Sequence, residues 1–539
     1  MIMNSGGGKK FKWTVLKHNG PMFPPAYVPH RIPIMINNQP FIFPPEAEEM
    51  ATLYSRYLGT EYLENARFKR NFWKDFKKVL PSGLETIIQS MDDLDLQPYK
   101  NHLEKEREKR LALSKDEKEK AKLKREKVEE PFKYCIIDGA QQKVGNYKIE
   151  PPGIFMGRGK HPKIGRFKPR LRPEDVTINI SKDAKIPKPN VPGEWQEVIH
   201  DREVVWLATW KDFITDKNKY IFTSVEATFK SKSDEKKFDL AKKVKRKIKS
   251  IRENYQKDLV SDDIKKKQLA TALYFIDNLA LRVGGKKDKK EEADTVGVTS
   301  LRVEHITLLP PNIVKLDFLA KDSVRFCKKV NVSKPIFDNI ILFMNNKSRK
   351  EQLFDLVTAS TINQYLENFM KNLTAKVWRT YNASTVFQKE LDKINEDKIK
   401  AFDENQRINY LLSMFIQANT VVALLCNHQK TVSSNLDKVI ENLDLKIKEL
   451  KKKKNKYLTK KKKDLAKKVD SKLKLLKLKK NNKINQKNVS LNTSKINYID
   501  PRIIFSFVKK FNIPEEKIFT KKELKRFEWA SSVDKEYRF

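Results

Sequence analysis

The stretch Leu269-Ala-Thr-Ala-Leu-Tyr-Phe-Ile-Asp-Asn-Leu-Ala-Leu-Arg282 sets the expected fold of the second half of the chain. Its apolar residues recur every three or four positions, which is the period of an amphipathic helix. We therefore predict a helix within residues 260–283, with Arg282 at its C-terminal end. An arginine at a helix end is most often a solvated cap, so this residue alone indicates little about function.

A second pattern follows in residues 312–330, where apolar side chains alternate with polar ones. A period of two predicts β-strands, and Ala320-Lys321-Asp322 interrupts the alternation. We expect a hairpin with Lys321 at its tip.

Two segments upstream also have recognisable patterns. Residues 194–229 are predicted to form short strands of an α+β unit. Asn101–Glu130 is predicted to be a charged helical stretch, either a projecting helix or a solvated face.

Glycine and proline divide the chain into two halves. No glycine follows Gly297, and no proline lies between Pro335 and Pro501. Because these residues break helices and form turns, the first 190 residues are expected to be turn-rich mixed structure and the remainder mainly helical. The length of 539 residues suggests three or four domains.

Charge points to the class of partner. The chain carries 112 Lys and Arg against 69 Asp and Glu, a formal net charge of +43. Nucleic acid is the expected partner, since each neutralised phosphate releases counterions; the alternative is a solvated basic surface. No run resembles a membrane span or an apolar leader, and three distant cysteines suggest a reducing compartment rather than a disulfide framework.

Residues 431–490 are the most basic segment, with 21 Lys, no Arg and 6 acidic residues. Apolar residues recur at helical spacing on both sides of Asn455–Thr459. This predicts two amphipathic helices, joined near those residues and packed as an antiparallel pair. The alternative is a disordered basic tract.

Two kinds of active-site motif are missing. No Gly-x-x-x-x-Gly-Lys-Ser/Thr loop occurs, which disfavours an ATP-driven motor, and the seven histidines have no metal-ligand spacing. We therefore expect neither a cofactor nor a bound metal. What remains for phosphate chemistry is side-chain charge at Arg282, Lys321, Arg379 and His428, together with Tyr498. Each residue taken singly is a weak signal.

Several longer motifs occur in a fixed order: Ile149-Glu-Pro-Pro-Gly153, Gly157-Arg-Gly159, Asp294-Thr-Val-Gly297, Ser300-Leu-Arg-Val-Glu-His305 and Ser494-Lys-Ile-Asn-Tyr-Ile-Asp-Pro-Arg502. Over nearly the whole chain they resemble the eukaryotic type IB DNA topoisomerases, the family of nuclear topoisomerase I. The resemblance departs from the family at Met156, where members can have an arginine. It implies that Tyr498 is the nucleophile and that Arg282, Lys321, Arg379 and His428 complete the catalytic set. It further implies contacts to DNA or to the cleavage site from Arg158, His161, Lys163, Lys168, Lys219, Tyr220, Asp322, Lys376 and Asn497.

The resemblance also implies the organisation of the chain. The expected fold class is multidomain α+β: a mixed α/β cap in residues 1–226, a mainly α catalytic lobe of the tyrosine recombinase and type IB topoisomerase kind in 227–430, a basic helical-hairpin linker in 431–489 and a small α C-terminal domain in 490–539. Cap and catalytic lobe would clamp double-stranded DNA between them.

The activity implied is relaxation of positive and negative supercoils through a 3′-phosphotyrosyl intermediate, without ATP or an obligatory metal. A monomer in the nucleus, sensitive to camptothecin-type inhibitors, is expected. Two rival interpretations are a site-specific tyrosine recombinase, which uses a comparable residue set, and a chromatin-binding protein that has lost activity.

Overall fold

The computed structural model describes residues 11–539 except 225–227, 286–287, 289–290, 401 and 431–434. The chain divides into two units. Unit 1 is Met1–Lys230 with Lys287–Asp294, and unit 2 is Ser231–Lys286 with Thr295–Phe539. Both combine helices with small sheets, so the mixed α/β character predicted from the sequence is confirmed.

Unit 1 is built on small sheets, as its glycine and proline content predicts. Its largest sheet has the order β11-β10-β8-β9 and packs Val176, Ile178, Ala208 and Ile221 into a buried core. The strands are β8 (Val176–Asn179), β9 (Glu197–Ile199), β10 (Trp206–Lys211) and β11 (Asn218–Phe222). The last three confirm the strands expected in residues 194–229.

The other elements of unit 1 lie around this sheet and a second core. A three-stranded sheet has the order β1-β4-β5, and two strand pairs complete the unit. Their bounds are β1 (Leu16–His18), β2 (Ile34–Ile36), β3 (Gln39–Phe41), β4 (Tyr134–Ile137), β5 (Ala140–Lys143), β6 (Gly153–Ile154) and β7 (Phe167–Lys168). Helices α1 (Pro45–Ser55) and α2 (Ala66–Phe76) bury Tyr54, Phe68, Phe72 and Phe76 in the second core.

The charged stretch before β4 is helical, but it forms two helices rather than one. They are α3 (Gln97–Ala112) and α4 (Lys115–Glu129), and both expose most of their side chains. Ser114 begins α4, because its side chain accepts a hydrogen bond from the backbone N–H of Glu117 while the Glu117 carboxylate accepts one from Ser114 N–H. The sequence contained this capping pattern inside the predicted stretch.

In unit 2 the helix expected in residues 260–283 is α7 (Ile264–Leu279). It ends earlier than predicted, because Ala280 adopts the left-handed conformation with φ 48°. Arg282 therefore lies beyond the helix, in a segment without regular secondary structure, and is not part of its last turn. This segment passes so close to Gly297 that a Cβ on Gly297 would lie 2.5 Å from Gly284 Cα.

The predicted hairpin is confirmed. Strands β13 (Ile313–Leu319) and β14 (Arg325–Asn331) pair antiparallel, with Leu319 opposite Arg325, and β12 (Ile306–Leu309) completes the sheet. A tight turn, Lys321–Ser323, forms the tip. Asp322 and Ser323 have φ of 67° and 58°, so the chain reverses direction through left-handed residues.

Helices enclose the core of unit 2, which includes Trp378, Phe387, Leu411 and Ile504. They are α5 (Thr228–Val244), α6 (Ile248–Asp258), α8 (Lys334–Met344), α9 (Ala359–Glu367), α10 (Ala375–Leu391), α11 (Glu396–Lys400), α12 (Glu404–Leu425), α15 (Leu491–Asn497), α16 (Pro501–Lys510) and α17 (Lys521–Arg526).

Helix α12 corrects one expectation. We expected no segment with the length and composition of a membrane span, but α12 has 22 residues and is apolar enough to cross a membrane by those criteria. In the structure it packs against α10, α14 (Lys463–Asn485) and α15, and it buries Leu411, Phe415 and Val422. The apolar side chains of α12 therefore form part of the core of unit 2.

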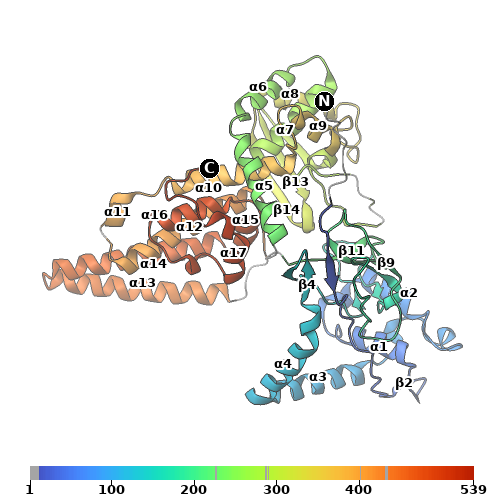
Figure 1. The fold of residues 1–539 in the computed structure, drawn as a ribbon. Helices are drawn as coiled ribbons and strands as arrows, with labels where there is room; N and C mark the ends of the chain where they lie inside the picture. Colours follow the sequence, from blue (N-terminus) through green and yellow to red (C-terminus); the bar gives the residue numbers. More distant parts are fainter. Residues whose placement is uncertain (1–10, 225–227, 286–287, 289–290, 401, 431–434) are drawn as a thin grey trace. The chain divides into compact units, whose positions relative to one another are not determined.

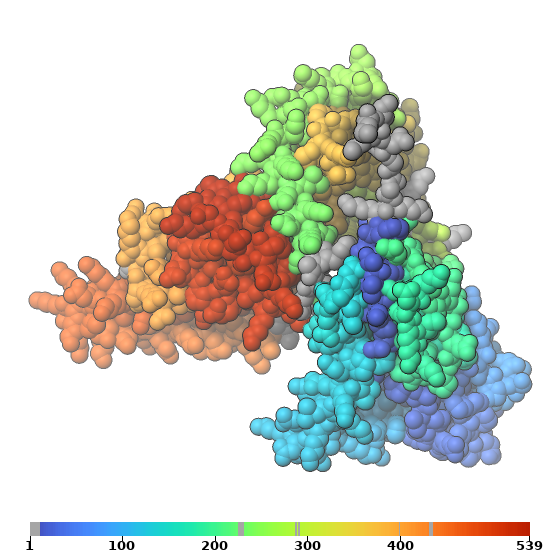
Figure 2. All heavy atoms as spheres, in the orientation of Figure 1, coloured from blue at the N-terminus to red at the C-terminus, as the bar shows by residue number. Residues whose placement is uncertain are grey.

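The basic segment forms α13 (Leu436–Thr459) and α14, which lie side by side as the predicted antiparallel pair. The connection lies at Lys460–Lys462, slightly later than expected, because α13 continues through Asn455–Thr459. Leu443, Ile447, Val469 and Leu473 are buried, so the periodic apolar residues hold the pair together. Figure 2 shows the outer face of the pair, in orange, at the surface.

Candidate active site

A cavity of about 130 Å³ in unit 2 gathers four of the five predicted catalytic residues. Each comes from a different segment: Arg282 from the chain after α7, Lys321 from the hairpin tip, Arg379 from α10 and His428 from the turn after α12. Asp322 also lines the cavity. Residues separated by up to 146 positions in the sequence thus meet at one place.

A buried carboxylate aligns the helices that carry these residues. Asp277 on α7 accepts hydrogen bonds from Arg252 Nε of α6 at 2.8 Å and from Tyr255 Oη of α6 at 2.9 Å. It also accepts one from Trp378 Nε1 of α10 at 3.0 Å. Trp378 directly precedes Arg379. The position of Arg379 is therefore coupled to α7, the helix that leads to Arg282.

Arg379 is held by backbone carbonyls. Only 5% of the residue is exposed, and its two terminal nitrogens donate to the carbonyl oxygens of Ala280 and Cys426. These carbonyls follow the ends of α7 and α12, respectively. Within the part of the chain that the structure describes, its Nε has no hydrogen-bond partner. The guanidinium is thus fixed in place with donors still available.

His428 is buried and neutral. It follows Asn427, which has φ 52°, and its backbone N–H donates to Ala423 O at 2.8 Å. Burial lowers the pKa of the imidazole to about 3, and the positive charges of Arg379 and Arg282 contribute to the same shift. Its Nδ1 lies 2.7 Å from Ser494 Oγ, while its Nε2 has no partner among the described residues. At neutral pH this side chain offers one N–H and no charge.

Tyr498 lies beside the cavity, directly after α15. Its ring centroid is 5.4 Å from that of His428 and 5.2 Å from the guanidinium carbon of Arg379. Ser384 Oγ on α10 donates to Tyr498 O at 3.1 Å and accepts from Asp500 N–H at 3.0 Å. One serine thus fixes the backbone on both sides of Ile499.

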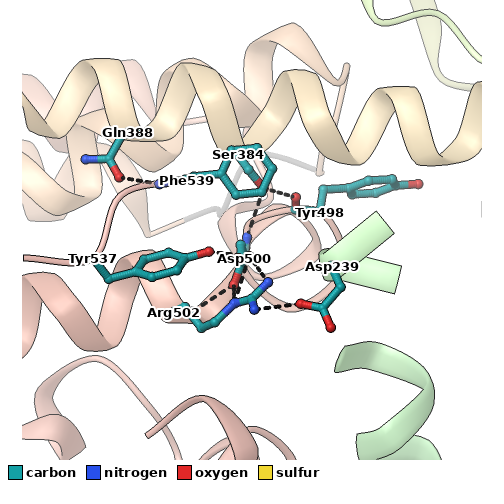
Figure 3. A network of polar contacts seen from close by, with 8 residues as sticks. All are labelled: Asp239, Ser384, Gln388, Tyr498, Asp500, Arg502, Tyr537 and Phe539. Carbon is teal, nitrogen blue, oxygen red and sulfur yellow. Dashed lines mark hydrogen bonds and ion pairs between the residues drawn. The ribbon is translucent and has the colours of Figure 1, made fainter. Parts of the chain in front are cut away.

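The segment after Tyr498 is anchored by the polar network drawn in Figure 3. Asp500 is fully buried, accepts from the backbone N–H of Arg502 at 2.9 Å and so caps α16. Arg502 pairs with Asp500 at 2.8 Å and with Asp239 at 2.7 Å, and Tyr537 Oη donates to Asp500. In Figure 3 the Tyr498 ring is directed away from this network. The network therefore holds the backbone and leaves the hydroxyl outside it.

Two further predicted residues of unit 2 are exposed near these helices. Lys376 is in the first turn of α10, and Asn497 ends α15, where its side-chain amide donates to Thr493 O at 3.2 Å. The backbone carbonyl of Asn497 accepts from Lys237 Nζ at 3.2 Å. Both side chains are accessible to a large ligand.

The six predicted residues of unit 1 lie around β7, β11 and the loop before β7. Arg158 is exposed in this loop, whereas His161 is only 9% exposed and packs its ring 4.8 Å from that of Phe155. Tyr220 on β11 is 36% exposed, and its ring centroid lies 5.9 Å from that of Trp206 and 5.8 Å from that of Phe222. The loop and the strand thus present both charge and an aromatic surface.

The lysines of this group are paired with carboxylates that we did not single out in the sequence. Glu150 accepts from Lys168 Nζ at 2.8 Å and from Lys219 Nζ at 3.0 Å, and Asp212 lies 2.8 Å from Lys219. Lys163 pairs with Glu291 and donates to Ile214 O at 2.6 Å. Sequence reasoning also missed Ser494 and Ser384. Ser494 could have been found, because it lies four residues before Tyr498, a spacing that would place both on one face of a helix.

The described residues contain no cluster of three or more His, Cys, Asp or Glu side chains arranged to hold a metal ion. The charges that face the cavity are those of arginine, lysine and one aspartate. The site can therefore bind an anionic group such as a phosphodiester next to a tyrosine hydroxyl.

Comparisons with known proteins agree along the chain. Residues 11–223 match the model for the "Eukaryotic DNA topoisomerase I, DNA binding fragment", residues 226–462 that for the "catalytic core", and residues 470–539 that for the "C-terminal topoisomerase domain". The human protein "DNA topoisomerase I, mitochondrial" is 40% identical over 97% of this chain and 90% of its own length. Human "DNA topoisomerase 1" is 38% identical over 98% of this chain and 72% of its own length. "DNA topoisomerase 1 beta" of Arabidopsis thaliana is 40% identical, and the chain spans 60% of it.

Proposed function

The chain belongs to the eukaryotic DNA topoisomerase I family, and from this premise we propose that it relaxes supercoiled duplex DNA as a type IB enzyme. It would cut one strand, allow the duplex to rotate and reseal the strand. The observation that supports this best is the cavity of unit 2, where Arg282, Lys321, Arg379 and His428 surround one space beside Tyr498. This is the residue set needed to exchange one phosphoester for another.

In the proposed reaction the Tyr498 hydroxyl releases its proton to water, and the resulting phenolate oxygen attacks the scissile phosphorus. A bond from Tyr498 Oη to phosphorus forms while the bond to the 5′-oxygen breaks, which leaves a 3′-phosphotyrosine and a 5′-hydroxyl. Negative charge grows on the non-bridging oxygens. The guanidiniums of Arg282 and Arg379 stabilise that charge, and neutral His428 donates a further hydrogen bond.

Lys321 is the proposed general acid. The departing 5′-oxygen needs a proton, and an ammonium group can give one whereas a guanidinium effectively cannot. Lys321 lies at the exposed hairpin tip on the edge of the cavity, where a DNA strand can reach it. Resealing is the reverse: the 5′-hydroxyl attacks the phosphotyrosine and returns the proton to Lys321. Because one phosphodiester replaces another, neither ATP nor another cofactor is required.

Duplex DNA is the proposed substrate, bound through its phosphates. The family match to a DNA-binding fragment, the net charge of +43 and the loop and strand around Arg158 and Tyr220 support this. The domains would be the cap in 1–226, the catalytic lobe in 227–430, the linker in 431–489 and the C-terminal domain in 490–539. We propose that the chain acts as a monomer, mainly on nuclear DNA, and that camptothecin-type inhibitors bind its cleaved complex.

The first test is relaxation of positively and negatively supercoiled plasmid in EDTA and without ATP. We expect the parent chain to relax both, and Tyr498→Phe to bind DNA without relaxing it. Denaturing the parent reaction should trap protein on the 3′ side of a nick. Binding of DNA by both proteins with relaxation by neither would instead favour a DNA-binding protein without activity.

A further inference from the structure

We propose that Ser494 is a positioning residue for catalysis: its hydroxyl donates to Nδ1 of His428, so that Nε2 carries the ring proton and donates it to a non-bridging oxygen of the scissile phosphate. The hydrogen bond from Nε2 to the phosphate rests on the proposed function. The hydrogen bond from Ser494 to Nδ1 of His428 concerns the protein without DNA. Ser494 belongs to α15, the helix that leads directly into Tyr498.

The contact is short and fully enclosed. Ser494 Oγ lies 2.7 Å from His428 Nδ1, Ser494 is completely buried and only 8% of His428 is exposed. The backbone reinforces the pairing, because Ser490 N–H donates to His428 O at 2.8 Å. Two hydrogen bonds therefore hold the turn after α12 against the start of α15.

The surroundings of His428 keep its imidazole neutral, with one proton on the ring. Burial, together with the charges of Arg379 and Arg282, makes a second proton on His428 unfavourable, and among the described residues no carboxylate pairs with the ring. A neutral imidazole has one N–H and one acceptor nitrogen, so the hydrogen bond at Nδ1 decides what Nε2 can do. With a serine hydroxyl donating to Nδ1, Nε2 is the donor.

The ring nitrogen that Ser494 does not contact is Nε2. Nε2 is buried and has no hydrogen-bond partner in the described part of the chain, and His428 lines the cavity with Arg282 and Arg379. A buried donor without a partner is costly, and a ligand that supplies an acceptor removes that cost. Phosphate oxygens only accept hydrogen bonds, so the Nε2–H tautomer is the one that fits.

Ser494 also links the histidine to the nucleophile. Its backbone carbonyl accepts from the N–H groups of Tyr498 and Ile499, both at 3.0 Å. One residue thus orients His428 through its side chain and Tyr498 through its main chain. Substitution to alanine removes only the first of these contacts.

The tautomer is tested first, in the protein without DNA. NMR of the chain labelled with ¹⁵N in the histidine rings should show a protonated Nε2 and an unprotonated Nδ1 for His428, assigned by comparison with His428→Ala. Ser494→Ala should shift His428 toward a mixture of tautomers. A proton on Nδ1 in the parent would overturn the proposal whether or not the chain cleaves DNA.

The second test is single-turnover cleavage of a DNA duplex. Ser494→Ala should cleave about five- to tenfold more slowly than the parent, and near-isosteric Ser494→Cys, a weaker donor, should fall in between. In the His428→Ala background Ser494→Ala should cause no further loss. An equal loss in both backgrounds would mean that Ser494 acts on folding or on α15 alone. Ser55→Ala is the matched control, since Ser55 is also fully buried but lies in α1.

A methylphosphonate at the scissile position sharpens this test, because methyl replaces one non-bridging oxygen and cannot accept a hydrogen bond. On the diastereomer that lacks the oxygen contacted by His428, parent and Ser494→Ala should cleave equally. On the other diastereomer the five- to tenfold difference should remain. A difference of the same size on both would contradict the proposal. A parent inactive on ordinary DNA would overturn the proposed function, and the NMR result would still decide the role of Ser494.

Discussion

Burial of His428 next to two arginines has a consequence for stability in acid. In the folded chain the pKa of this histidine is lowered to about 3, whereas in the unfolded chain it has its ordinary value near 6.5. Between these values the unfolded state binds more protons than the folded state. Folding stability therefore falls as pH drops from about 6.5 toward 3, and this histidine costs about 2 kcal/mol at pH 5.

We predict that His428→Gln, which cannot be protonated, loses less stability in acid than the parent. The difference in unfolding free energy between pH 7 and pH 5 should be smaller by about 2 kcal/mol in the variant. Urea unfolding at the two pH values measures it. His18→Gln is a useful comparison, since burial also lowers the pKa of His18 in unit 1. Parallel pH dependence of parent and His428→Gln would show that His428 titrates normally.

The proposed role of Lys321 as the general acid leads to a second prediction. Lys321→Ala should cleave ordinary DNA at least 100-fold more slowly, because the departing oxygen lacks its proton. DNA with sulfur in place of the bridging 5′-oxygen should be cleaved by the variant almost as fast as by the parent, since a thiolate leaves without protonation. Single-turnover cleavage of both substrates provides the measurement. Lys315→Ala, on the same hairpin but away from its tip, is the control.

Two glycines fix the segment that carries Arg282. Gly284 has φ +84°, and a Cβ on Gly297 would lie 2.5 Å from Gly284 Cα and 2.7 Å from the carbonyl oxygen of Arg282. We predict that Gly297→Ala pushes this segment outward and lowers cleavage at least tenfold. Gly153→Ala is the control, because a Cβ there meets nothing within 4 Å. Cleavage at the parent rate by Gly297→Ala would contradict this account.

The network around Asp500 makes a prediction about stability. Replacing Asp500 by alanine removes the cap of α16 and leaves the half-buried Arg502 without the fully buried one of its two carboxylate partners. We expect a loss of about 3–5 kcal/mol in unfolding free energy. Asp338→Ala breaks an exposed ion pair with Lys334 on α8 and should cost less than about 1 kcal/mol. Similar losses in the two variants, measured by urea unfolding, would refute the structural importance of the network.

At the scale of the whole molecule, positive charge is the dominant property. The pair α13–α14 carries much of it, and the lysines of the connection (Lys460–Lys462) and the first residue of α14 (Lys463) are all exposed. The pair lies in the chain between His428 and Tyr498, so we expect it to interact with the duplex during rotation without taking part in cleavage.

We predict that replacing Lys460, Lys461, Lys462 and Lys463 by glutamine leaves single-turnover cleavage unchanged. Plasmid relaxation should change its rate and depend less on salt. Each phosphate that the protein no longer neutralises makes the slope of log affinity against log salt shallower by about 0.9. The same four changes at Lys105, Lys109, Lys115 and Lys120, on α3 and α4, provide a control of equal charge. An unaltered salt dependence would show that the connection does not bind DNA.

The local pattern of residues in the sequence determines a large part of the fold of this protein. The period of apolar residues predicted α7, the β13–β14 hairpin and the α13–α14 pair, and the order of long motifs identified the family. These features depend on neighbours in the sequence, so the residues suffice to predict them. The predictions were wrong where a single residue sets the end or the start of a helix. Ala280 ends α7 before Arg282, and Ser114 begins α4 within the charged stretch before β4.

Only the tertiary structure decided how the candidate site is assembled. The length and apolar composition of α12 are compatible with either a membrane span or a core helix. Its packing against α10, α14 and α15 shows that it is a core helix of unit 2. The pairing of Lys219 with Glu150, and of His428 with Ser494, joins segments far apart in the chain. The residue types were visible in the sequence. Their distances, burial and protonation depend on non-local packing, which no local pattern encodes.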